Sequence, residues 1–530
     1  MAINVEVSVM PVWPRASFRV FAPPTERLGP VSQPKISISR RTVLLGAGLA
    51  GAAGAVGLKA GPAAASTGPF AHPGLLHTSA DFSRIQTKLA AGDPVVTAGW
   101  QRLTANGRSQ SSWKPRPLAT VIRGGTGQNY AQFYLDVHAA YQNALRWRIT
   151  GEAAHGDTAR DILNAWSGTL TAVNGNADRF LAAGIYGYQF ANAAELLRGY
   201  AGFDLARAQQ LLKTVFYPMN EDFLVRHNTA CITNYWANWD LCTVASIMAI
   251  GILCEDRTLF DRAVGYAQNG AGNGSIPHAI PFLYGDLGQW QESGRDQGHT
   301  VLGVGLLGTI CEMAWNQGVD LYGYDNSRFL KGAEYVARYN LGQDVPFTTY
   351  RWGSGTTCAP QQQTVISAAS RGLARPVWEV VYNHYVQRRG LAAPNVSAMA
   401  ASLRAEGGGG DYGSDSGGYD SLGFGTLMFT RDRVTAAAAA TSTPASSATP
   451  RPRTHTRRVS TGSSASVTPP HGSPSASAAA AIDSPRLDLA GQRSTLGAGP
   501  IAGLAGGVAA TAAISGALLL RLRNRRRHAE

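Results

Sequence analysis

Arg295 and His299 lie four residues apart in segment 288–300, which reads GQWQESGRDQGHT. Residues at this spacing share one face of a helix, one turn apart. A guanidinium is a permanent cation that can hold a carboxylate through two parallel hydrogen bonds, and an imidazole gains or loses a proton near neutral pH. The pair is therefore suited to acid–base chemistry on an anionic ligand, with Arg295 holding the anion and His299 moving the proton.

A second segment, 228–240, concentrates amides and aromatic rings in the run NTACITNYWANWD. Asn234 and Asn238 are also four apart, so their amides share a helix face and could donate hydrogen bonds to the same ligand. Trp236 and Trp239 offer flat rings on which sugars could stack. The competing interpretation is that the asparagines cap a helix and the tryptophans pack in the core.

The two segments together resemble the alginate-lyase domain of polysaccharide lyases, of the secreted actinobacterial type. The resemblance spans about residues 70–430 and is carried by five short runs: HPGLLHT at 72–78, NYWANW at 234–239, ESGRDQGHT at 292–300, RP at 375–376 and YNHY at 382–385. This chain differs at one position, because better-known alginate lyases have Asn-Asn-His where it has Asn234-Tyr235-Trp236. A histidine base cannot be carried over to that position.

The resemblance implies β-elimination across C4–C5 of a uronic acid. Arg295, with Asn234 or Asn238, would neutralise the sugar carboxylate so that the charge developing beside it is stabilised. His299 is the first candidate for the base, and Tyr235 or a tyrosine of the 382–385 run is the candidate acid.

Further side chains are candidates for substrate binding because they share these motifs or place polar groups on apolar helices: Trp236, Trp239, Trp290, Glu292, Gln297, Tyr382, His384 and Gln189. Core packing and an Arg295–Asp296 ion pair are the alternatives. His138, His155 and His278 show no ligand-like spacing, so neither a metal nor a cofactor is predicted.

Two other functions fit the same residues. A glycoside hydrolase needs two carboxylates facing one glycosidic bond, and Asp240, Glu292 and Asp296 are available. A catalytically silent surface protein that binds glycan would use the same aromatic and cationic groups.

The elements that position these residues are predicted to be helices. In 130–150, apolar residues recur at spacings of three and four, and Thr78 and Asp93-Pro94 are typical helix starts. Similar stretches follow at 153–172, 178–200, 203–216, 233–256, 258–269, 295–316, 325–340, 375–390 and 394–405. We expect an all-α domain of helical hairpins arranged as an incomplete α/α toroid, with an α-solenoid as the alternative.

Charge is distributed unevenly along the chain, whose formal net charge is +13. Residues 1–65, 431–495 and 521–530 together carry +14, so residues 66–430 are close to neutral. The basic flanks are therefore poor evidence for nucleic-acid binding, and none is predicted. An anionic polysaccharide, the expected partner, would have to be held by a local cationic site.

Five cysteines stand at positions 231, 242, 254, 311 and 358, with no CxxC spacing. The favoured interpretation is buried apolar thiols, with one bridge from Cys231 to a distant cysteine as the alternative.

Both ends of the chain resemble targeting segments. Residues 1–65 contain Arg40-Arg41, an apolar stretch and the small-residue site at 63–65, which together predict export by the twin-arginine translocase. The expected domain order continues with a catalytic domain at 66–432 and a disordered Ala/Ser/Pro-rich stalk at 433–497. A single transmembrane helix at 498–520 and a basic cytoplasmic tail at 521–530 would then anchor the domain on the extracellular face of the membrane.

Overall fold

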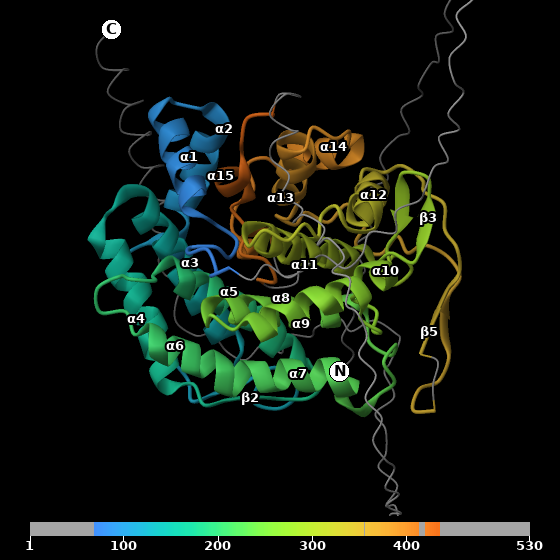
Figure 1. Ribbon diagram of the computed structural model, residues 1–530, viewed down its shortest axis with the longest axis horizontal. Helices are drawn as coiled ribbons and strands as arrows, with labels where there is room; N and C mark the ends of the chain where they lie inside the picture. Colours follow the sequence, from blue (N-terminus) through green and yellow to red (C-terminus); the bar gives the residue numbers. More distant parts are fainter. Residues whose placement is uncertain (1–67, 354–355, 413–418, 435–530) are drawn as a thin grey trace, which may run out of the picture. The chain divides into compact units, whose positions relative to one another are not determined.

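The computed structural model describes residues 68–434 apart from 354–355 and 413–418, and most of these residues are helical (Figure 1). The α-helices of this part are α1 (Ser79–Ala90), α2 (Pro94–Ala105), α3 (Ala131–Thr150), α4 (Ala153–Thr169), α5 (Asp178–Leu196), α6 (Leu205–Leu211), α7 (Tyr217–Arg226), α8 (Ala237–Leu253), α9 (Arg257–Asn269), α10 (Ile276–Ala279), α11 (Gln297–Asn316), α12 (Tyr324–Asn340), α13 (Trp378–Tyr382), α14 (Pro394–Leu403) and α15 (Gly425–Phe429). Shorter turns of other helix types are η1 (Gly107–Ser109), η2 (Leu212–Phe216), η3 (His227–Thr229), η4 (Asn383–Arg388) and η5 (Gly409–Tyr412).

Local sequence signals account for several helix starts. Thr78 and Asp81 form the predicted capping box before α1, each side chain accepting a hydrogen bond from the other's backbone N–H. Asp93 accepts from the N–H groups of Val95 and Val96 at the start of α2, with Pro94 at the first helical position. These two predicted starts are confirmed.

Three central helices, α5, α8 and α11, run in the same direction. Gly184 of α5 lies against Cys242 of α8, and Gly187 lies against Ser246. Residue numbers therefore increase in the same direction along both helices, which makes them parallel. Near the far end of α5, the amide of Asn192 contacts the sulfur of Met313 in α11 at 3.8 Å. All three helices therefore begin at one end of the core, and the positive ends of their dipoles gather there.

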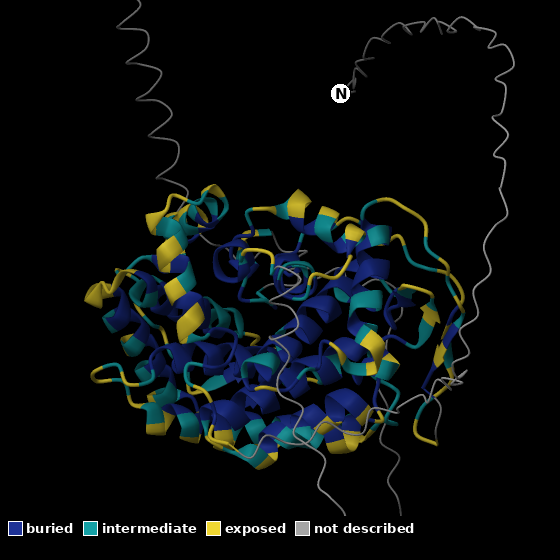
Figure 2. Ribbon diagram, turned by 45° about the horizontal axis from the view of Figure 1, so that its top comes forward, coloured by how far each residue is buried: buried dark blue, intermediate teal, exposed yellow. Residues whose placement is uncertain are grey.

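The central helices are buried along nearly their whole length. All residues of α8 except Trp239 are buried, and the same holds for most of α5 and α11. Figure 2 shows buried residues in the interior and exposed residues on the surrounding helices. Each fully buried leucine, isoleucine or valine contributes about 1.5–3 kcal/mol to the hydrophobic free energy of folding. A side chain at Gly184 would meet the sulfur of Cys242 at 2.5 Å, so the close approach of α5 and α8 requires glycine.

Surrounding helices return the chain between the central ones. α3 and α4 form a hairpin whose turn contains Gly151 at φ 78°, a left-handed conformation that favours glycine. α8 and α9 form another hairpin, with Phe260 packed close to Gly251. α4 and α9 each bury one face only, the pattern expected of helices on the outside of a helical domain.

The expectation of an all-α domain is wrong in one detail, because the described residues also contain three small two-stranded sheets. β1 (Thr120–Ile122) pairs in parallel with β2 (Ala172–Asn174). β3 (Phe282–Tyr284) and β4 (Leu287–Gln289) form one antiparallel hairpin, and β5 (Tyr350–Trp352) and β6 (Gln361–Gln363) form the other. Three-residue strands are too short to show an alternating pattern in the sequence, which is why they were not predicted. The domain is therefore mostly, but not purely, helical.

The predicted signal region, stalk, transmembrane helix and tail, at 1–65 and 433–530, lie almost entirely outside the described residues. Within 68–434, excluding the two short gaps, the search for a helix both long enough and apolar enough to span a bilayer finds none.

Candidate active site

Arg295 and His299 meet at the N-terminal end of α11, as their spacing predicts. The guanidinium Nη2 of Arg295 lies 3.1 Å from Nε2 of His299. Its Nη1 donates to Oε1 of Glu292 at 2.9 Å, and its Nε lies 3.5 Å from Asp296. The side chain of Arg295 is 26% exposed and that of His299 is 41% exposed, so both remain within reach of a ligand.

Asp296 fixes the orientation of His299. Its carboxylate caps α11 by accepting from the backbone N–H of His299 at 2.8 Å, and it lies 2.7 Å from Nδ1 of the imidazole. Although burial raises the pKa of Asp296, the hydrogen bonds from His299 hold it below its ordinary value. An ionised carboxylate only accepts, so Nδ1 carries the proton and Nε2 presents its lone pair to Arg295.

Glu292 joins this site to the start of α8. Its second oxygen accepts from the backbone N–H of Asn238 at 3.2 Å, and the neighbouring Gln291 accepts from that of Ala237 at 3.0 Å. Side chains of a distant segment therefore cap α8, which has no side-chain cap of its own. Burial raises the pKa of Glu292 to about 8, although Arg295 lowers it.

Aromatic rings form one wall beside Arg295. The guanidinium lies 5.0 Å from the centre of the Trp236 ring, and Trp236 packs on Trp352 of β5 at 4.7 Å. Tyr235 accepts a hydrogen bond from Asn228 at 2.9 Å, and its ring packs 4.6 Å from Trp239. Trp236 is thus the ring nearest the reactive pair, whereas Trp239 packs inward against Tyr235 and Phe223.

A disulfide between Cys231 and Cys358 links this wall to the β5–β6 hairpin across 127 residues of chain. The favoured prediction of five free thiols is therefore wrong for this pair. Cys242 and Cys311 are free and buried, and Cys254 is free and half-buried. The bond and the Trp236–Trp352 contact hold the hairpin against the segment that bears Asn234.

Three residues predicted as substrate contacts have side chains that are buried and engaged with other parts of the protein. Trp290 is fully buried and packs on Gly303. Gln297 is buried and bonded to the carbonyls of Ser293 and Ser367. Glu292 is buried and supports Arg295 instead of reaching a ligand.

Two other predicted substrate contacts lie apart from the Arg295–His299 pair: Tyr382 accepts a hydrogen bond from Gln387, and His384 lies near the opposite end of α11. His384 is buried and bonds Arg388, which pairs with Glu312. Glu312 follows His299 by 13 residues, which corresponds to about 20 Å along a helix. Tyr385, the other tyrosine of that run, is buried and donates to the carbonyl of Tyr322, so it is excluded as the acid.

The remaining predicted amides differ in accessibility. Asn234 is half-buried in the turn before α8, close to Trp236 in the chain. Asn238 is buried, and its Oδ1 lacks a hydrogen-bond partner among the described residues. Gln189 of α5 is fully buried and donates to the carbonyl of Tyr419 at 2.7 Å.

The sequence analysis did not identify Arg375 or Asp420 as part of the site. Arg375, noted only as part of the resemblance, donates to the carbonyl of Gly298 at 3.2 Å and to Asp420 at 2.9 Å. It braces the turn next to His299 from a segment about 80 residues away. Only the spatial contact reveals this role, because neither residue has a local motif.

The geometry argues against a glycoside hydrolase. Glu292 is fully buried, and Asp240 is buried between His227 and the backbone N–H of Gly274. Asp296 alone among the three predicted carboxylates is partly accessible, whereas hydrolysis needs two carboxylates on one bond.

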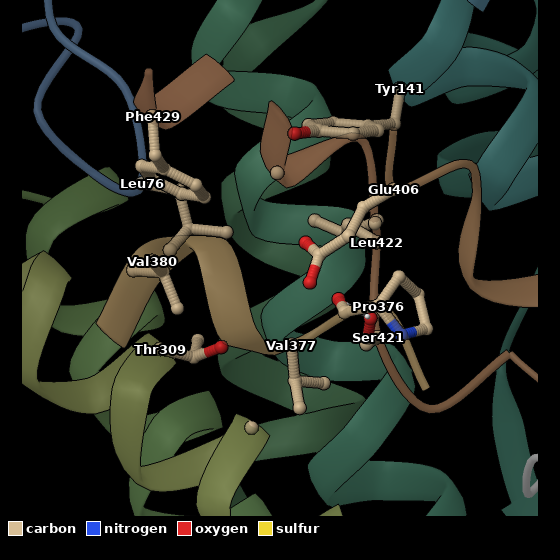
Figure 3. Close-up of a pocket in the computed structure, with 13 residues that line it drawn as sticks. Leu76, Tyr141, Thr309, Pro376, Val377, Val380, Glu406, Ser421, Leu422 and Phe429 are labelled. Atoms are coloured by element: carbon tan, nitrogen blue, oxygen red, sulfur yellow. Dashed lines mark hydrogen bonds between the residues drawn. The ribbon is translucent and has the colours of Figure 1, made fainter. Parts of the chain in front are cut away.

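An internal cavity next to Glu406 does not serve as the site (Figure 3). Its volume is about 40 Å³, far below that of pockets that hold sugar-sized ligands. Burial raises the pKa of Glu406 to about 8, and the carboxyl accepts from the backbone N–H of Trp378, as expected of a structural group. Within the described part of the chain, no three His, Cys, Asp or Glu side chains are grouped to hold a metal ion.

One family model matches the central part of the chain. Residues 106–346, which include both site segments, match the family model for alginate lyase. The chain contains an alginate lyase domain and is a polysaccharide lyase. In this lyase, Arg295, Asp296 and His299 come from the matched region, whereas Cys358, Arg375 and Asp420 follow it.

Several solved structures are similar to the lyase. They include alginate lyase A1-III from Sphingomonas species A1, at 16% identity and a TM-score of 0.43, covering 66% of this chain and 94% of that chain. An alginate lyase from Bacteroides ovatus has 11% identity and a TM-score of 0.44, covering 66% of this chain and 100% of that chain. No curated protein matches the chain.

Proposed function

We propose that the enzyme cleaves a uronic-acid polymer by β-elimination, with Arg295 neutralising the sugar carboxylate and His299 removing the C5 proton. The observation that carries the proposal is the position of Arg295, half-exposed over Trp236 and bonded on its other sides to Glu292 and to Nε2 of His299. Arg295 therefore contacts the proposed base directly and is still accessible to the carboxylate of a bound sugar.

The contact between Arg295 and His299 suggests how substrate binding prepares the base. In the free enzyme the lone pair of Nε2 accepts a hydrogen bond from Arg295. A bound carboxylate is a stronger acceptor than a neutral imidazole, so the guanidinium turns toward it and releases Nε2. His299 then takes the C5 proton, and Asp296 at 2.7 Å stabilises the imidazolium that forms.

The remaining steps balance the elimination. The C5–H electron pair forms the C4=C5 double bond, the C4–O4 bond breaks, and O4 leaves with a proton from an acid. Tyr235 is the candidate acid that stays near the site. Burial raises its pKa although Asn228 and Arg179 lower it, so the phenol is protonated at neutral pH and able to donate.

Helix ends and amides add to the electrostatic stabilisation. α5, α8 and α11 begin on the same side of the core, so their N-terminal dipoles favour a negative ligand there. The Asn234 amide is the accessible donor, whereas Asn238 is buried in the first turn of α8. Trp236 supplies a ring face for the sugar.

Ultraviolet absorbance of unsaturated products tests the proposal. The full chain is incubated with polymannuronate, polyguluronate and glucuronan in separate reactions, and both absorbance and chain length are measured. Absorbance that rises as the chains shorten supports elimination. Shortening without absorbance indicates a hydrolase, and polymer retention without shortening indicates a glycan-binding protein.

Glu292 predicts the alkaline limb of the activity profile. Its pKa is raised to about 8, so the carboxyl is neutral below that value and anionic above it. The anion competes with the substrate for Arg295, so kcat/KM should fall by about tenfold for each pH unit above the pKa. Glu292→Gln, which cannot ionise, should lose this limb when rates are measured across the range. An unchanged limb in the variant would assign it to another group.

We further propose that the helical hairpins form an incomplete α/α toroid and that the domain is exported and membrane-anchored. The parallel central helices and the returning outer ones support the toroid.

Arg40-Arg41, the apolar run at 498–520 and the following arginines support export and anchoring, and a disulfide is typical of proteins in oxidising compartments. Replacing Arg40 and Arg41 by lysine should retain the protein inside the cell, and deleting 498–520 should release it from membranes. Activity confined to the cytoplasm of cells making the unaltered chain would contradict this localisation.

A further inference from the structure

Arg123 directly follows β1 and lies against two tyrosine rings. The centre of its guanidinium is 5.1 Å from the ring of Tyr130 and 5.6 Å from that of Tyr186. Its backbone N–H donates to the carbonyl of Asn174 at 3.0 Å, which fixes the start of the side chain. The stacked rings restrict a flexible side chain to one orientation, so little entropy is lost when it binds a ligand.

The guanidinium of Arg123 has unused hydrogen-bonding capacity. Its one side-chain hydrogen bond runs from Nη1 to the hydroxyl of Tyr186 at 3.3 Å. In the described part of the chain, no carboxylate lies within 4.0 Å of it, whereas Arg295 and Arg375 both have carboxylate partners. Asp420 and Asp178 attract Arg123 only from beyond that distance, so this half-buried arginine with five N–H donors keeps most of them without a protein acceptor among the described residues.

Aromatic rings continue from Arg123 along one side. Tyr134 lies 5.7 Å from Tyr130 and stacks on Tyr419 at 4.3 Å. Arg108 lies over Tyr419 at 4.7 Å, but its charge is already directed toward Asp411 at 3.9 Å. Flat, half-buried tyrosines next to an unpaired arginine are the groups that hold an acidic sugar, by its ring face and by its carboxylate.

Tyr130, Tyr134 and Tyr419 form a tyrosine strip. A short series of contacts connects this strip to Arg295 and His299. Asp420, next to Tyr419 in the chain, accepts from Tyr188 of α5 at 2.5 Å and pairs with Arg375 at 2.9 Å. Arg375 in turn donates to the carbonyl of Gly298, the residue before His299. The loop at 419–420 therefore borders both the tyrosine strip and the turn that carries the base.

We propose that Arg123 binds the carboxylate of a second uronic acid of the polymer, with Tyr130 and Tyr134 against its sugar ring. The inference rests on the proposed lyase function and specifies its substrate. A chain with acid groups on more than one sugar would engage Arg295 and Arg123 together. Arg123 is then a specificity-determining residue that acts on binding and leaves the elimination step itself unchanged.

Oligosaccharides of graded length test this assignment. Uronate oligomers of two to about six sugars are prepared from whichever of the three polymers the unaltered enzyme degrades. Arg123→Gln should raise KM on the order of 10- to 100-fold for the longer oligomers, the effect of losing a charged hydrogen bond, with kcat nearly unchanged. The shortest cleaved oligomer, whose sugars fill only the two positions that flank the cleaved bond, does not reach Arg123 and should show the same KM in both enzymes.

Arg257→Gln is the matched control. Arg257 also lies against two aromatic rings, Phe70 at 3.7 Å and Phe260 at 5.2 Å. It begins α9, beyond the far end of α8 and about 25 Å from the site by helix length. This variant should leave KM unchanged for every oligomer, and circular dichroism should show that both variants are folded.

The outcomes separate the two proposals. An unaltered enzyme that yields no unsaturated product refutes the lyase function. An active enzyme whose Arg123→Gln variant has the same KM for all lengths, or loses kcat equally for all, refutes the second binding position. Arg123→Lys keeps the charge without the two-pronged geometry, and an intermediate KM for that variant would support a bound carboxylate.

Discussion

Arg295→Ala is expected to lower kcat by about 10²- to 10³-fold, the usual cost of losing one group that stabilises transition-state charge. The reason is that Arg295 would supply the positive charge that makes the C5–H bond acidic. The KM should rise as well, because the same contact binds the ground-state carboxylate. Product absorbance on the preferred polymer measures both parameters.

The control addresses the buried carboxylate that the substitution leaves behind. Without Arg295, Glu292 loses the 2.9 Å contact that favours its anion, so its already raised pKa should rise further and the group should be neutral. The double variant Arg295→Ala/Glu292→Gln removes this complication and should be equally inactive. Activity within tenfold of the unaltered enzyme, or loss of helicity in both variants, would leave Arg295 as a structural ion-pair partner.

His299→Gln is expected to reduce kcat by about 10²- to 10⁴-fold, the range for removing a general base. Glutamine keeps a polar group of similar reach but cannot accept the proton. The KM should change little, because Arg295 and Trp236 still bind the substrate. Initial rates at saturating polymer measure the effect.

Asp296→Asn provides the comparison for His299. The amide still accepts from the backbone N–H of His299, so α11 should keep its cap while the imidazole loses its anionic partner. A base oriented by Asp296 predicts an intermediate loss of kcat and an unfolding temperature close to that of the unaltered enzyme. If His299→Gln keeps full activity, the base must be another residue near Tyr235.

The helices were largely predictable because their signals are local. The apolar spacing in 130–150 matches α3 to within one residue, and the Thr78 and Asp93 caps start α1 and α2 as expected. The start of α8 was predicted at 233 but lies at Ala237. Its caps come from Gln291 and Glu292, more than 50 residues away, and no local pattern reveals such partners.

The site was predictable only where its residues are neighbours in sequence. The spacing of Arg295 and His299 anticipated their contact, because a helical turn brings them together. Trp290 and Gln297 belong to the same motif, but their part of the turn faces the core, and composition alone does not show which way a turn faces. Trp352 and Arg123 were missed because their partners lie on other elements.

The bond between Cys231 and Cys358 has a practical consequence for anyone producing this enzyme. Protein made in a reducing host would lack the disulfide bond that holds the β5–β6 hairpin, and with it Trp352, against Trp236. The catalytic rate of such a preparation is expected to be low, even though every reactive side chain is chemically intact. Thiol reductants in purification buffers would have the same effect, so oxidation state needs to be verified by mass before any variant is compared.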